Sequence, residues 1–81
     1  MDELKSSKKR IIGLKQTVKA VNENKVYKVY IANDADNYIK SSILKACNGK
    51  DLEILYVNTM KELGEACGIE VKASTASLLK S

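Results

Sequence analysis

Two carboxylates stand two positions apart in NDAD, residues 33–36. Asp34 and Asp36 are the residue type that paired acid/base catalysis uses. Aspartate between a strand and a helix, however, is more commonly a helix cap or a turn former. We therefore interpret both residues as structural and predict that Asp36 is the N-cap of the helix that follows it.

The other reactive side chains are two cysteines, Cys47 and Cys67, in a chain that has no histidine. These residues are too few to build a zinc site or a Cys–His nucleophile within one chain. The sequence also has no phosphate-binding glycine loop of standard spacing and no nucleophilic triad. We predict a protein that is not an enzyme, has no metal site or cofactor, and keeps both thiols reduced and partly buried.

A different kind of chemistry is suggested by GLKQTVK, residues 13–19. At 3.6 residues per turn, Lys15, Gln16 and Lys19 fall within an arc of about 100° on a helix. Lysine donates to phosphates and guanine edges, and glutamine both donates to and accepts from base edges. Gly13 would let another backbone approach the helix start, where exposed N–H groups attract anions. A solvated basic face behind a glycine turn would give the same pattern.

Small and apolar residues also occupy LGEACGIEVKAST, residues 63–75. Gly64 lies inside a predicted helix, where glycine costs about 1 kcal/mol relative to alanine, so a close approach by another group is expected there. Ile69 and Val71 fall in a connecting loop. Such side chains usually pack into the core; otherwise they form an apolar surface on which an unstacked base can stack.

The net charge of +4 is unevenly distributed along the chain. Residues 1–28 include eight basic and three acidic residues, whereas residues 29–81 include six basic and seven acidic residues. This asymmetry indicates either a polyanionic partner or a solvated basic face. The sequence shows no signal peptide and no apolar run near the ~20 residues that span a bilayer, so we expect a cytoplasmic protein without membrane contact.

Helical and strand-like patterns alternate along the 81 residues. Predicted helices cover 4–12, 14–24, 37–47 and a segment from Thr59 to Gly68; predicted strands cover 26–32, 52–57 and 73–80. Leu14, Val18 and Val21 form the core face of the second helix. We predict one α/β domain over residues 1–81, a three-layer α/β/α sandwich with a central mixed four-stranded sheet, and a monomer.

Three stretches, IIGLKQTVKAV, IANDAD and ELGEACGIEVKAS, occur in an order and spacing that resemble a known family. They are similar to the kink-turn-binding ribosomal protein family, which includes archaeal and eukaryotic large-subunit and small-nucleolar-particle proteins. The greatest similarity is to its short bacterial branch, the YbxF type. The resemblance covers essentially the whole chain. It implies an α/β/α sandwich that stabilises RNA kink-turns, helical elements sharply bent at a bulge beside sheared G·A pairs.

Carried over by position, the resemblance implies roles for the residues of both stretches. Lys15 and Gln16 stand where the archaeal pattern has an Asn–Glu pair that reads the guanines of the G·A pairs. Lys19 would complete this contact, and Gly13 would permit the close approach. Asp36 would lie near the flipped-out bulge nucleotide. The implied RNA-binding residues are Gly13, Leu14, Lys15, Gln16, Thr17, Lys19, Asp36, Lys61, Gly68, Ile69, Glu70 and Val71.

Two departures from the family pattern bear on these expectations. Gln16 is an uncharged amide in the place of an acid, so guanine recognition is expected to be altered or weakened. Asn37 stands where the family often has proline, so that helix start is expected to be looser. The expected partner is a kink-turn in ribosomal or regulatory RNA, and the ribosome is a further candidate partner. The alternative is a protein-interaction or assembly module that keeps the fold but has weak or lost kink-turn specificity.

Overall fold

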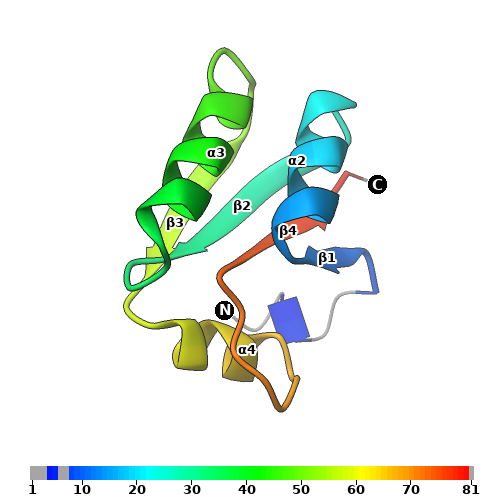
Figure 1. Ribbon diagram of the computed structural model, residues 1–81. Helices are drawn as coiled ribbons and strands as arrows, with labels where there is room; N and C mark the ends of the chain where they lie inside the picture. The colour runs from blue at the N-terminus through cyan, green and yellow to red at the C-terminus, as the bar shows by residue number, and fades with distance from the viewer. Residues whose placement is uncertain (1–3, 6–7, 81) are drawn as a thin grey trace.

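A computed structural model describes residues 4–5 and 8–80, and its helices lie on both faces of a four-stranded sheet (Figure 1). The elements follow in the order β1 (Arg10–Ile12), α2 (Leu14–Asn22), β2 (Val26–Ala32), α3 (Asn37–Cys47), β3 (Glu53–Val57), α4 (Met60–Ala66) and β4 (Thr75–Leu79). Helices α2 and α3 lie side by side on one face of the sheet. The predicted three-layer α/β/α sandwich is confirmed.

The strand order in the sheet is β1-β4-β2-β3, so the last strand along the chain lies between β1 and β2. Strands β2 and β3 are parallel, whereas β4 runs antiparallel to both of its neighbours. Ile12 pairs with Ala76, and Ala32 pairs with Val57. The ends of β1, β2 and β3 and the start of β4 therefore meet at one end of the sheet, which we call the Ala32 end.

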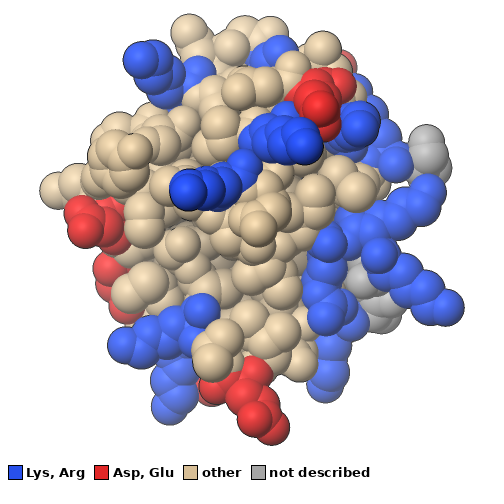
Figure 2. Space-filling model, turned by 45° about the vertical axis from the view of Figure 1, so that its right-hand side comes forward, with Lys and Arg blue, Asp and Glu red and all other residues tan. Residues whose placement is uncertain are grey.

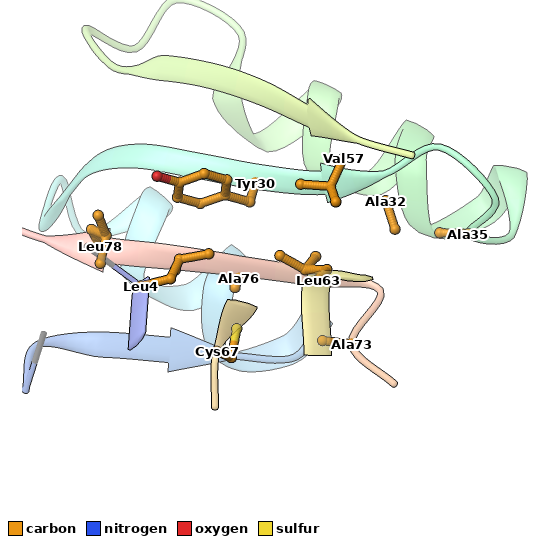
Figure 3. Close-up of a cluster of buried hydrophobic side chains, with 10 residues drawn as sticks. All are labelled: Leu4, Tyr30, Ala32, Ala35, Val57, Leu63, Cys67, Ala73, Ala76 and Leu78. Atoms are coloured by element: carbon orange, nitrogen blue, oxygen red, sulfur yellow. The ribbon is translucent and has the colours of Figure 1, made fainter. Parts of the chain in front are cut away.

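The sheet separates two apolar clusters, because successive strand residues point to opposite faces. Val29 and Ile31 of β2 pack beneath α2 and α3, against Val21 and Ile43. Tyr30 and Ala32 face the other way. The cluster on that side, drawn in Figure 3, consists of Leu4, Tyr30, Ala32, Ala35, Val57, Leu63, Cys67, Ala73, Ala76 and Leu78. Helix α4 thus provides the third layer through Leu63, and Cys67, which follows the helix directly, packs in the same cluster.

The predicted helix over residues 4–12 is wrong in its C-terminal part. Leu4 and Lys5 are helical, residues 6–7 lie outside the described residues, and Arg10–Ile12 form β1. Backbone pairing with β4 overrides the local preference of this segment. The Arg10 guanidinium also donates hydrogen bonds to the carbonyls of Leu4 and Lys5, at 3.2 and 3.1 Å. Strand β1 is the fourth strand, which the sequence pattern did not locate.

Both cysteines are free thiols inside the protein, as predicted. Burial raises the pKa of the Cys47 thiol, because the charged thiolate loses its hydration. Burial also raises the pKa of Cys67, while the positive charge of Arg10 acts in the opposite direction. Raised pKa values keep both groups in the unreactive thiol form at neutral pH. Among the described residues no cluster of three or more metal-ligating side chains occurs, and none of their helices has the length and apolarity needed to cross a bilayer.

Candidate nucleic-acid interface

Three connections converge at the Ala32 end of the sheet. The amide of Gly13, at the start of α2, donates to the Thr75 carbonyl at 3.0 Å. The amide of Ala32 donates to the Ser74 carbonyl, also at 3.0 Å. The start of α2, the turn at residues 33–36 and the connection at residues 67–74 are therefore neighbours. The two stretches singled out in the sequence come together in space.

Helix α2 begins at Gly13 without a side-chain cap. Gly13 has φ = +108°, a conformation that L residues rarely adopt, and a Cβ there would lie 3.2 Å from Gln16 Oε1. The backbone conformation at position 13 thus itself requires glycine. This requirement explains Gly13 more directly than the close approach of another backbone, which we expected from the sequence. Because no cap accepts from them, first-turn N–H groups of α2 stay available at the positive end of the helix dipole.

The other two helix starts at this end are satisfied from within the protein. The Asp36 carboxylate accepts from the Tyr38 amide at 3.5 Å, which confirms Asp36 as the N-cap of α3. Thr59 Oγ1 accepts from the Glu62 amide at 3.0 Å, and Asp34 Oδ1 accepts from the Met60 amide at 2.7 Å. Asp34 is therefore a capping residue, as predicted, although it caps α4 and not the helix that follows it in sequence.

The polar side chains of α2 divide between its exposed face and its buried face. Lys15, Gln16 and Lys19 are exposed. Thr17, which the resemblance placed among the RNA-binding residues, is fully buried, and its hydroxyl lies 3.4 Å from that of Ser77 in β4. The Thr17 side chain therefore fixes α2 to the sheet beneath the exposed face. Leu14 is half-buried and packs against the cluster under α2 and α3.

The connection after α4 is held by two backbone hydrogen bonds at the helix end. Gly68 has φ = +76°; its amide donates to Glu65 O at 3.0 Å and the Ile69 amide donates to Gly64 O at 3.1 Å. This pair of bonds is a Schellman motif, which ends the helix and turns the chain sharply. The predicted helix end near Gly68 is confirmed to within two residues, because α4 ends at Ala66.

Gly64 has a close neighbour, as its position inside a helix predicted. A Cβ on Gly64 would overlap the carbonyl of Val71 and lie 3.3 Å from Lys72 Cα. The approaching group is thus the backbone of the chain's own connection, which crosses α4 at this point. This contact holds residues 71–72 against the helix.

The two apolar residues of this connection have different surroundings. Ile69 is half-buried and packs against the core cluster on the α4 side. Val71 is 69% exposed, and Glu70 beside it is also exposed. Val71 is therefore the residue that presents an apolar surface outward. Lys61 is exposed on α4.

The lysines of the protein differ in whether they are paired. At the opposite end of the sheet, Lys25 lies 3.4 Å from Glu23, and Lys28 lies 3.6 Å from Glu53. No described residue forms an ion pair or a hydrogen bond with the side chain of Lys15 or Lys19. Figure 2 shows lysine and arginine side chains gathered on the right and in the upper middle of the view, with acidic side-chain atoms beside the upper group and an uncharged surface between the two groups.

One exposed residue at this end was not predicted from the sequence. Tyr38, in the first turn of α3, is 72% exposed and lies across a groove from Lys15 and Lys19. Its signal in the sequence was its place on α3, off the apolar face formed by Ile39, Ile43 and Cys47.

This α/β/α sandwich has the fold of a known solved structure, and its sequence matches a known family. Residues 1–81 match the family described as Ribosomal protein L7Ae/L30e/S12e/Gadd45. The chain belongs to this family, which confirms the resemblance seen in the sequence.

Relatives of known name agree with this assignment. The chain is 52% identical over 69 residues to an RNA-binding protein of Caldanaerobacter subterraneus subsp. tengcongensis, covering 85% of this chain and 84% of that one. It is 38% identical over 72 residues to the RNA-binding protein YbxF of Geobacillus stearothermophilus, covering 89% of this chain and 88% of that one. The solved structure of a 15.5 kD RNA-binding protein of Giardia lamblia superposes on this chain with a TM-score of 0.83 at 28% identity. The match covers 99% of this chain and 68% of that one. Membership in this family confirms the prediction that the protein is not an enzyme.

Proposed function

We propose that this protein binds RNA at the Ala32 end of its sheet and stabilises kink-turns in ribosomal or regulatory RNA. Its two relatives described above are named RNA-binding proteins, and they match over most of their length. Binding the bent form more tightly than the straight form would shift the RNA toward the kink, as a population shift requires.

The observation that carries this proposal is the start of α2. Its backbone N–H groups have no side-chain cap, and Lys15, Gln16 and Lys19 are exposed on its first turns. Lys15 and Lys19 have no ion-pair partner among the described residues. Unpaired donors at a helix start suit phosphate and the acceptor edges of guanine.

In the proposed complex, Lys15 and Gln16 contact guanine edges of the sheared G·A pairs, and Lys19 contacts the neighbouring phosphate. An ordinary A-form duplex has a major groove too narrow for side chains, whereas a sharp bend opens it. The amide of Gln16 can both donate and accept, in contrast to the acid implied by the resemblance. We therefore expect Gln16 to read a guanine edge with a donor as well as an acceptor.

The exposed Val71 would form an apolar surface for an unstacked bulge base. Its backbone is held by the crossing at Gly64 and the Schellman motif at Gly68, so the surface is preformed. Glu70 and Gly68 would flank this base, and Asp36 would lie near the flipped-out nucleotide. Thr17 and Leu14 would contribute indirectly by fixing the orientation of α2. Lys61 would add a phosphate contact from α4.

Titration of the wild-type protein against two RNAs tests this function. One RNA is a generic kink-turn, and the other has Watson–Crick pairs in place of its sheared G·A pairs. At about 0.15 M salt, nonspecific phosphate attraction is weakened enough to expose a difference between them. We expect tight binding to the kink-turn and a large loss on the control. Equal and weak binding to both would contradict kink-turn recognition and favour the protein-interaction module.

A further inference from the structure

Helices α2 and α3 enclose a groove of about 530 Å³ that opens beside Lys15. Its floor contains Leu14 and Val18 of α2, which are half-buried. Lys15 and Lys19 form one rim, and Tyr38 stands on the opposite wall. Because Lys15 belongs to both the groove and the start of α2, the groove continues directly from the proposed kink-turn site.

The spacing of the groove residues gives the groove a cationic end next to Lys15. Lys15 and Lys19 are four residues apart on α2, so both ammonium groups lie on the same side of the helix. The Tyr38 side chain is 72% exposed, and it has no hydrogen bond or ring contact with any described residue. Glu23 also lines the groove, in the turn that follows α2, so the end next to Lys15 is the cationic one.

We propose that this groove holds an unpaired nucleotide adjoining the bound RNA element, with its base stacked on Tyr38 and its phosphates beside Lys15 and Lys19. This inference rests on the proposed RNA-binding function. An exposed aromatic ring beside a row of cations is the arrangement that proteins use to bind single strands, because every base has a face that can stack. The apolar floor at Leu14 and Val18 would exclude water from the edge of the stacked base.

Hydrogen bonds at the start of α3 fix the backbone that carries the Tyr38 ring. The Tyr38 amide donates to Asp36, and the Tyr38 carbonyl accepts from Ser42 Oγ at 2.7 Å. The backbone of this residue is thus fixed at the start of α3, while its ring remains open to solvent. A stacking residue on a rigid element loses little further backbone freedom when a base binds.

The test compares a kink-turn RNA without unpaired ends with versions that carry an overhang of about four nucleotides at each strand end in turn. We expect at least one overhang to raise the affinity of the wild-type protein by roughly 5- to 100-fold, the range that stacking of one base supplies. Tyr38→Ala should remove this gain and leave the affinity for the RNA without overhangs unchanged. Tyr38→Phe should keep the gain, because the ring and its face remain.

A matched control is available in Tyr56, which is 52% exposed on β3 and does not line the groove. Tyr56→Ala should leave the gain from the overhang intact. A 2-aminopurine base in the overhang adds a direct readout, because its fluorescence is quenched by stacking. We expect quenching with the wild-type protein and Tyr38→Phe, and none with Tyr38→Ala.

Two results would overturn the inference: no overhang raises the affinity, or Tyr38→Ala retains the whole gain. A glutamate-rich peptide that binds the wild-type protein but not Tyr38→Ala, while no overhang helps, would instead identify the groove as a site for an acidic protein segment. Failure of the proposed kink-turn function is recognised separately, by equal binding of kinked and straight RNA without overhangs. The overhang alone, titrated as a single strand against the same variants, would then test the groove.

Discussion

The starts of α2 and α4 lie at the same end of the sheet but are built in opposite ways. Helix α4 begins with two side-chain acceptors, Thr59 and Asp34, which take hydrogen bonds from the amides of Glu62 and Met60. Helix α2 begins at Gly13, where no side chain accepts. The donors of α4 are used to hold the fold together, whereas those of α2 remain available to a ligand.

The two helix starts therefore have separate roles, one in stability and the other in binding, although both lie at the same end of the sheet. Glycine in place of a capping side chain costs only a few tenths of a kcal/mol, so leaving α2 uncapped at Gly13 has a small cost. The cost is offset by the attachment of α2 to the sheet through Thr17 and Ser77 and through the Gly13–Thr75 hydrogen bond. We infer that changes at the start of α4 mainly alter unfolding, and that changes on the exposed face of α2 mainly alter RNA affinity.

The largest effect is expected on the α4 side, from Gly64→Ala. The new Cβ would overlap the Val71 carbonyl, and the neighbour is backbone, which cannot rotate away. We expect the free energy of unfolding to fall by about 2–3 kcal/mol, as measured by urea denaturation. Glu65→Ala, at an exposed position of the same helix, is the control and should change stability by less than about 0.5 kcal/mol. Equal stability of the two variants would mean that the connection does not press on α4.

On the α2 side, Lys15→Ala and Gln16→Ala should weaken binding to the kink-turn by about 1–3 kcal/mol each. Their unfolding midpoints should stay close to that of the wild type, because both side chains are exposed. Lys45→Ala, an exposed lysine in the last turn of α3, is a matched loss of charge and should barely affect affinity. Equal losses on kinked and straight RNA from Lys15→Ala would exclude a base-reading role for this residue.

The reverse pattern is expected for Thr59→Ala. Loss of the cap should lower the free energy of unfolding by about 1 kcal/mol, because the Glu62 amide loses its acceptor. Thr59→Ser keeps a hydroxyl at this position and should recover most of the loss. RNA affinity of the folded protein should be unchanged in both variants. A clear loss of affinity in Thr59→Ala alone would show that the two helix starts are coupled.

The smallest effect is expected from Lys8→Ala, just before β1. Lys8 is exposed, and we expect it to contact phosphate without reading bases. Its removal should weaken binding to all RNAs similarly, by less than about 1 kcal/mol, and reduce the salt slope of log K by about 1. Lys45→Ala, in the last turn of α3, is again the control. A loss confined to kinked RNA would give Lys8 a more specific role than proposed.

The elements that the sequence located are those whose signals are local. The cap at Asp36, the helix over residues 37–47 and the strand over residues 26–32 were all readable over a few residues. Strand β1 was missed because its partner lies more than 60 residues away, in β4. No sequence pattern within residues 4–12 indicates that pairing.

The site was anticipated in part for the same reason. Exposure of Lys15, Gln16 and Lys19 follows from helical periodicity, and the structure agrees with it. The burial of Thr17 does not follow, because its hydroxyl is satisfied by Ser77, a residue 60 positions away. The glycine at position 64 signalled a close neighbour correctly, but only the folded chain shows that this neighbour is its own backbone.

The central position of β4 also governs when the proposed site can form during folding. Strand β1 has no other partner among the described strands, and its pairing with β4 closes a loop of more than 60 residues. Such nonlocal pairing raises the contact order and slows folding, since loop entropy is lost before the contacts compensate. Helix α2 can form early, but Thr75 anchors its start and Ser77 meets its buried hydroxyl. A partly folded chain that still lacks β4 would therefore carry the basic helix without the geometry needed to distinguish one RNA from another.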